Sequence, residues 1–101
     1  MPDIIHGPRF YFGDYVPTNV SVLVTATTLL AADAAIRRVQ LTNLGAYPVY
    51  FCHLNQTPLV NKGFYIAPNG GVFIFDADCA PIGGISAIAD GGTSIVAVGR
   101  G

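Results

Sequence analysis

The sequence predicts an all-β protein, a β-sandwich or jelly roll of seven to eight short antiparallel strands with an extended N-terminal arm. Three observations predict this class. Short runs rich in β-branched and aromatic residues recur from residue 20 onward. Turn sequences containing Asn-Gly, Asp-Gly or Gly-Gly separate these runs. Every acidic residue is Asp, and the absence of Glu, a good helix former, disfavours helices.

Residues 1–19 differ in composition from the rest of the chain. Several prolines and glycines there prevent a regular element, yet the segment is richer in aromatic residues than a disordered tail. We expect an arm that becomes ordered by packing, either on its own domain or on a neighbouring subunit, followed by a sandwich domain at 20–101. The residues expected to make the arm's contacts are Arg9, Phe10, Tyr11, Phe12 and Tyr15.

The predicted strands follow the arm in order. The run 20–25 is rich in β-branched residues. In the run 36–43, Val39 and Leu41 share one face and polar residues the other, which is typical of a half-buried strand. The run 48–54 is apolar on both faces, as in a central strand or one covered by a partner. The remaining runs are 64–67, 72–75, 85–89 and 94–98.

Alternation within these runs also predicts a core. The inward-facing residues are expected to be Val39, Leu41, Val49, Phe51, Ile66, Phe73, Phe75, Ile88, Val96 and Val98. The segment 28–38 leaves two alternatives open. Its alanines favour a short helix with Thr27 or Thr28 as N-cap, whereas the succession of strands favours an extended or irregular connection.

The charge composition excludes several classes of function. Only 11% of residues are charged and the net charge is −1, so we expect no nucleic-acid partner. No apolar run is long enough to span a membrane, and the N-terminus lacks the basic region of a secretory signal. So few charges cover little of a small domain's surface. We therefore expect a homo-oligomer, with a trimer favoured.

Few residues in the chain could support catalysis. Cys52 and His53 are neighbours on a predicted strand and point to opposite faces, which disfavours a thiolate–imidazole pair. The two cysteines, Cys52 and Cys79, lack paired spacing and are expected to be free thiols. The glycines match no phosphate-binding pattern. We expect no enzyme and no cofactor.

Two sets of residues could hold a metal ion, and a simpler interpretation fits each of them. Asp76 and Asp78 would share a face of a strand and could hold a hard cation, but a solvated loop explains them equally well. A zinc site would need Cys52, Cys79, His6 and His53, which are scattered along the chain. We therefore expect no metal.

The stretch from residue 37 to 98 carries a recognisable order of motifs. It begins with Arg-x-Val-x-Leu-x-Asn-x-Gly at 37–45, followed by Pro-Val-Tyr at 48–50. Gly-Phe-x-Ile-x-Pro-x-Gly follows at 63–70, and Ile-x-Ala-Ile-Ala-x-Gly-Gly-Thr-x-x-Val-x-Val closes it at 85–98. This order resembles the small β-sandwich virion proteins of tailed bacteriophages, especially head decoration or cement proteins.

The resemblance implies a non-enzymatic virion structural protein that binds the major capsid protein and stabilises the head. It implies a location on the capsid surface after assembly in the host cytoplasm. The alternatives are another phage structural module, such as a tail, fibre-base or head–tail connector component, and a carbohydrate-binding β-sandwich. For the last, the candidate stacking residues are Tyr47, Tyr50 and Tyr65.

Overall fold

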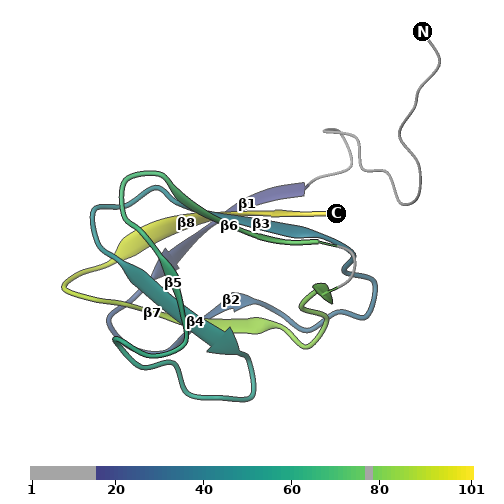
Figure 1. Ribbon diagram of the computed structural model, residues 1–101, viewed down its shortest axis with the longest axis horizontal. Coiled ribbons are helices and arrows are strands. Elements are labelled where there is room, and N and C mark those ends of the chain that lie inside the picture. The colour runs from purple at the N-terminus through teal and green to yellow at the C-terminus, as the bar shows by residue number, and fades with distance from the viewer. Residues whose placement is uncertain (1–15, 77–78) are drawn as a thin grey trace, which may run out of the picture.

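The computed structural model describes residues 16–76 and 79–101. Eight strands and no α-helix are found in this part of the chain, which confirms the predicted all-β class (Figure 1). The strands are β1 (Val16–Val22), β2 (Thr27–Leu30), β3 (Val39–Asn43), β4 (Val49–His53), β5 (Phe64–Ile66), β6 (Gly71–Phe75), β7 (Ile85–Ala89) and β8 (Ser94–Arg100). Within the described ranges, no helix is long and apolar enough to cross a membrane.

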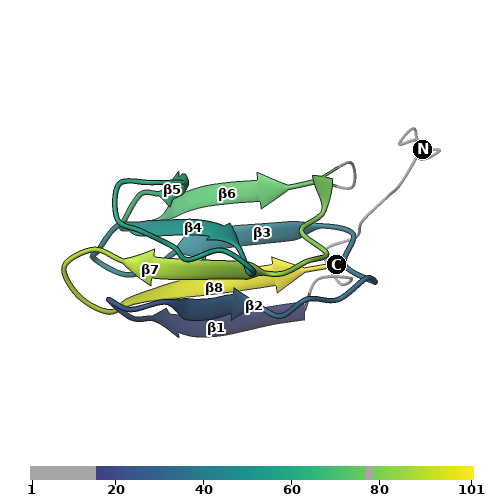
Figure 2. The same ribbon diagram turned by 90° about the horizontal axis from the view of Figure 1, so that it is seen from below.

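The strands form two four-stranded antiparallel sheets that lie as two layers (Figure 1). Sheet A has the order β1-β8-β3-β6, and sheet B the order β2-β7-β4-β5. The pairings are nested: β4 pairs with β5, β3 with β6, β2 with β7 and β1 with β8. The chain is therefore one long hairpin folded over into two sheets, which is the topology of a jelly roll. Figure 2 shows β1 and β6 at opposite edges of sheet A.

Strand β1 begins at Val16, so residues 16–19, which the sequence analysis assigned to the arm, belong to the sandwich. Pro17 was interpreted there as a breaker, but it lies on an edge strand, where one side of the backbone has no partner. The hydrogen-bond pattern of strands β8 and β3 shows whether the Pro17 nitrogen points toward β8 or toward the open edge.

In sheet A the backbone hydrogen bonds fix which residues face which neighbour. The Leu44 N–H donates to the Ile95 carbonyl (2.8 Å), so odd-numbered residues of β8 bond toward β3. Even-numbered residues of β8 therefore bond toward β1, where the register pairs them with even-numbered residues such as Val20. Pro17 is odd-numbered, so its nitrogen faces the open edge and no sheet hydrogen bond is lost.

The core lies between the two sheets. Seven of the ten predicted core residues are buried: Val39, Leu41, Val49, Phe51, Ile66, Val96 and Val98. Phe73 and Phe75 are partly buried against this cluster. Ile88 was predicted wrongly, because β7 turns Ile85, Ala87 and Ala89 inward and places Ile88 opposite Tyr50 on the outer face.

The alternatives left open for 28–38 resolve into strand β2 and an irregular connection. Leu29 and Leu30 are buried in the core. Beyond them the Asp33 carboxylate accepts hydrogen bonds from the Ala35 N–H (2.9 Å) and from Arg100 (2.9 Å). This local turn satisfies backbone groups that a helix would otherwise use, so the helix propensity of the alanines is overridden.

Candidate binding surfaces

The arm residues predicted to make contacts, Arg9, Phe10, Tyr11, Phe12 and Tyr15, lie outside the described residues. That prediction therefore remains untested. The candidate surfaces that follow come from the sandwich itself, where the strand register fixes which side chains lie together.

The first candidate is the face of sheet A that points away from the core, here called the sheet A outer face. The register aligns its side chains in rows across all four strands, with Asn19, Ala97, Thr42 and Val72 forming one row. The full set is Pro17, Asn19, Ser21, Gln40, Thr42, Leu44, Val72, Ile74, Ile95, Ala97 and Gly99. None of these side chains is charged.

The shape and chemistry of this face suit a protein partner. Small residues at its centre, among them Ala97 and Gly99, keep it low, while Val72 and Ile74 at one edge are 51% and 58% exposed. Interface centres are depleted in charge, and exposed apolar patches commonly mark interaction sites. A sheet face without charged side chains can therefore lose its water to another protein surface without the cost of desolvating an ion.

The second candidate is an aromatic pair on the outer face of sheet B. The rings of Tyr50 and Tyr65 lie 5.2 Å apart, tilted by 49°. The Tyr50 hydroxyl donates to Asn61 Oδ1 at 3.0 Å, which fixes one ring, and Tyr65 remains half exposed. Tyr47, the third residue of the predicted stacking set, lies instead against Gly91 and Gly92. Of the three predicted stacking residues, Tyr50 and Tyr65 therefore lie together and Tyr47 lies apart.

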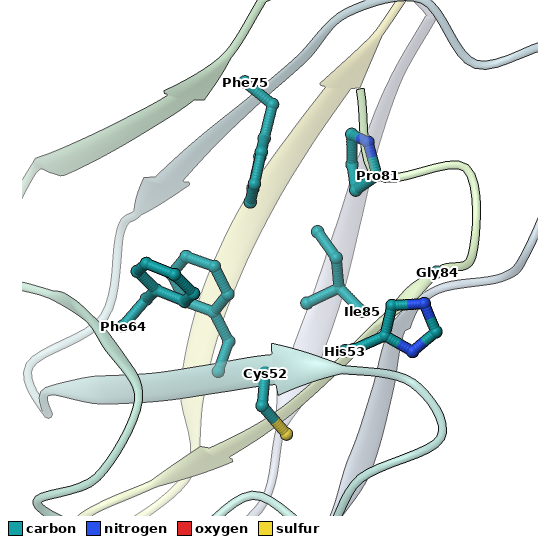
Figure 3. A pocket seen from close by; sticks show the side chains of 8 residues that line it. Cys52, His53, Phe64, Phe75, Pro81, Gly84 and Ile85 are labelled. Carbon is teal, nitrogen blue, oxygen red and sulfur yellow. The ribbon is translucent and has the colours of Figure 1, made fainter. Parts of the chain in front are cut away.

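A cavity of about 190 Å³ opens between the sheets near the end of β4 (Figure 3). Its lining is mainly apolar and comprises Phe51, Cys52, His53, Phe64, Phe75, Pro81, Gly84 and Ile85. The ring of Phe51 packs on Phe64, with 5.3 Å between ring centroids, and on Phe75, at 6.0 Å. This cavity can accept a small apolar group.

The two reactive residues at the cavity do not face each other. In Figure 3 the Cys52 sulfur points away from the ring of Phe75, and the His53 ring lies beside Gly84 at the rim. His53 Nδ1 lies 2.8 Å from Asn55 Oδ1, and a Cβ on Gly83 would collide with its ring. Burial raises the pKa of the Cys52 thiol, which disfavours the thiolate. The prediction that these neighbours diverge is confirmed.

The candidate metal ligands lie only partly within the described residues. Among residues 16–76 and 79–101, no group of three or more His, Cys, Asp or Glu side chains could hold a metal ion. The Cys79 thiol donates to Asp76 Oδ1 at 3.4 Å. Asp78 and His6 lie outside the described residues.

The low charge of the sequence predicts excess apolar surface but does not locate it. One sign of this face is present in the run 36–43. Its outward positions Gln40 and Thr42 are polar but uncharged, and they lie between charged residues and a turn. Locating the face also needed the order of four strands that are far apart in the chain.

No protein-family model matches the sequence, and neither a curated protein nor a solved structure matches it. The resemblance to virion proteins therefore stands on the sequence motifs alone.

Proposed function

We propose that this protein is a non-enzymatic virion structural protein, a capsid decoration or cement protein that binds the major capsid protein and stabilises the head. The observation that carries the proposal is the sheet A outer face, which spans four strands without a charged side chain. The motif order at 37–98, with its resemblance to head decoration proteins, supports the choice of partner.

A decoration protein needs a rigid body and a surface that attaches to a repeating shell. The closed pairing of β1 with β8 and the continuous apolar core supply rigidity. The sheet A outer face supplies a docking surface, and the aromatic arm at 1–15 supplies further apolar area. One fully buried Phe ring contributes about 1.5–3 kcal/mol by area transfer. A homo-oligomer, with a trimer favoured, would multiply these contacts through avidity.

The test compares two matched substitutions in a binding assay on heads assembled from the major capsid protein of the same genome. Thr42→Lys introduces a charge at the middle of the sheet A outer face. Thr28→Lys makes the same change at an exposed position on sheet B. We expect T42K to weaken co-sedimentation with heads by at least about tenfold, because a Lys must be desolvated there. T28K should bind as the unaltered protein does.

Three results would contradict the proposal: no binding of the unaltered protein, equal binding of both variants, or a reconstruction that places the chain elsewhere than on the shell. Copy number separates a decoration protein, which covers the shell, from a tail, fibre-base or connector component confined to one ring. Deleting residues 2–15 tests the arm. This deletion leaves β1 intact, and we expect a folded protein with weakened binding to heads.

A second candidate function, carbohydrate binding, is favoured by the Tyr50–Tyr65 pair. Lectin domains also use the jelly roll, and exposed aromatic rings stack on the apolar faces of sugars. A glycan screen followed by NMR titration tests it. Tyr65→Ala should abolish a real interaction and Tyr47→Ala should leave it unchanged, because Tyr47 lies away from the pair. A screen without any binder would reject this candidate.

A further inference from the structure

The sandwich has four edge strands, and three of them are protected against pairing with another strand. Edge strands present unpaired backbone groups, and proteins protect them with prolines, bulges or short lengths. Strand β1 carries Pro17 on its open side. Strand β2 has a register shift between Thr28 and Leu30. Strand β5 has only three residues.

Strand β6 has none of these protections. Its five residues, Gly-Val-Phe-Ile-Phe, pair in regular register with β3 and include no proline and no charge. The outward side chains of Val72 and Ile74 are more than half exposed. A regular, apolar strand at the edge of a sheet is a template for another strand.

The hydrogen-bond pattern identifies the backbone groups that are available on β6. Even-numbered residues of β3 bond toward β8, as the Gly101 N–H to Arg38 carbonyl bond (2.8 Å) shows, so the odd-numbered residues bond toward β6. The register pairs them with Phe73 and Phe75. Val72 and Ile74 therefore direct their N–H and C=O groups away from the sheet. No strand of the described residues pairs with them.

We propose that a second copy of this chain pairs on this edge, with the two β6 strands antiparallel about a two-fold axis at Phe73. In that register Val72 of each copy lies opposite Ile74 of the other, and each such pair exchanges two backbone hydrogen bonds. The β-branched side chains meet across the strands on the outer face, which is a favourable cross-strand pairing. Sheet A then continues from one copy into the other.

Three properties select a second copy as the occupant. The sequence of β6 is self-complementary about Phe73, with a β-branched residue on each side. An isologous contact requires such self-complementarity. The edge has no charge that would call for an oppositely charged partner. The partner strand also has the same length, so no unpaired stretch remains. The proposal is independent of a role in virions, and its two-fold contact makes a dimer, in place of the trimer favoured from composition, the expected state of the chain alone.

The experiment is sedimentation velocity on the full-length chain alone, over a wide concentration range. Ile74→Lys places a charge at the predicted contact. Ser21→Lys places the same charge on the same face of the sheet, at the opposite edge strand β1. We expect a dimer whose Kd rises at least about tenfold in I74K, because an Ile contact is lost and a Lys is brought to the contact. S21K should dimerise normally.

Amide hydrogen exchange tests the register directly. The amides of Val72 and Ile74 should become protected as the concentration rises, while those of Asn19 and Ser21, on the open side of β1, should exchange rapidly throughout. A chain that stays monomeric at high concentration overturns the proposal. So does a dimer that I74K leaves intact, or one that S21K weakens equally. A dimer lost on deletion of residues 2–15 would assign the edge to the arm instead. These experiments use the chain without phage heads. A failure to dimerise would therefore overturn only the β6 pairing, and the proposed capsid binding would still be decided by co-sedimentation with heads.

Discussion

The Ser94 hydroxyl donates a 2.6 Å hydrogen bond to Asn43 Oδ1, and both side chains are fully buried between the sheets. Asn43 Nδ2 also donates to the carbonyls of Tyr47 (2.7 Å) and Ile66 (3.2 Å). The Gly45 N–H donates to Asn43 Oδ1 at 3.1 Å. The amide thus has partners for both its donors and its acceptor, and it joins β3 to β5, to β8 and to the loop before β4.

Replacing Asn43 should strongly destabilise the fold. Asn43→Leu keeps the volume but leaves the buried Ile66 carbonyl, the partly buried Tyr47 carbonyl, an N–H and a hydroxyl without this partner. Each unsatisfied group costs about 1–3 kcal/mol, so we expect a loss of at least about 3 kcal/mol in the free energy of unfolding. Urea unfolding measures it. Gln40→Leu, at an exposed position of the same strand, is the control and should change stability by about 0.5 kcal/mol or less.

Gly45 is required because Ser94 lies against it. A Cβ there would collide with the Ser94 side chain and lie 2.8 Å from the Ser94 Cα, which is backbone and cannot easily move. We expect Gly45→Ala to cost about 2–3 kcal/mol through overpacking. Gly70→Ala is the comparison: it meets no atom within 4 Å but has a φ of +105°, and we expect about 1 kcal/mol. Equal losses in thermal or urea unfolding would contradict the collision argument.

Asp33 should make stability depend on pH in the acid range. Hydrogen bonds from the Ala35 N–H and then from Arg100 lower the pKa of this carboxyl below its ordinary value of 3.8. A lowered folded-state pKa gives stability that is present above the unfolded pKa and is lost as the pH falls through the folded value. We therefore expect Asp33→Asn to be less stable than the unaltered protein at neutral pH, with the difference narrowing from about pH 5 to about pH 2.

Urea unfolding at several pH values checks this expectation. Arg100→Gln separates the two causes, because it removes the ion pair but keeps the Ala35 bond. It should retain most of the acid dependence, since the Ala35 bond is the larger cause. A constant difference between D33N and the unaltered protein across the pH range would show that Asp33 titrates alike in both states.

Cys52 should react slowly with alkylating agents in the folded protein. Burial raises the pKa of its thiol, and the thiolate is the reactive form. In a Cys79→Ser background, which isolates Cys52, we expect the pH profile of iodoacetamide alkylation to lie at higher pH when folded than in urea. Mass spectrometry of quenched samples follows the reaction. A folded profile at or below the unfolded one would contradict the effect of burial.

Local sequence was sufficient for the strands but not for their faces. The alternation around Val39 and Leu41 assigned β3 correctly, because polar residues occupy its other face. The run Ile85–Ala89 is apolar on both faces, so alternation could not show which face of this strand points to the core. Ile88 was therefore wrongly predicted to be buried. The helix propensity of 28–38 was opposed by Leu29 and Leu30, which the core requires. The burial of Leu29 and Leu30 depends on both sheets being in place, so residues 28–38 alone could not predict it.

The candidate surfaces show the same limit. Low charge predicted excess apolar surface, but its concentration on sheet A depends on pairings between distant strands, such as Asn19 with Ala97. Asn43 ends the predicted strand 36–43, two residues before Gly45, and an Asn in such a position is typical of a turn and not of a core. Its burial follows from β5 and β8, which contribute Ile66 and Ser94.

The position of β8 has a consequence for synthesis on the ribosome. Of the eight described strands it is made last, yet it lies between β1 and β3 in sheet A. Until it emerges, β1 has no neighbour in its own sheet, and the inner face of β3 lacks Val96 and Val98 beside it. Pairing strands so distant in sequence is slow, and exposed apolar intermediates aggregate. The nascent chain therefore cannot complete sheet A stepwise from its N-terminal strand, and its uncovered apolar face is a substrate for chaperones until β8 has emerged.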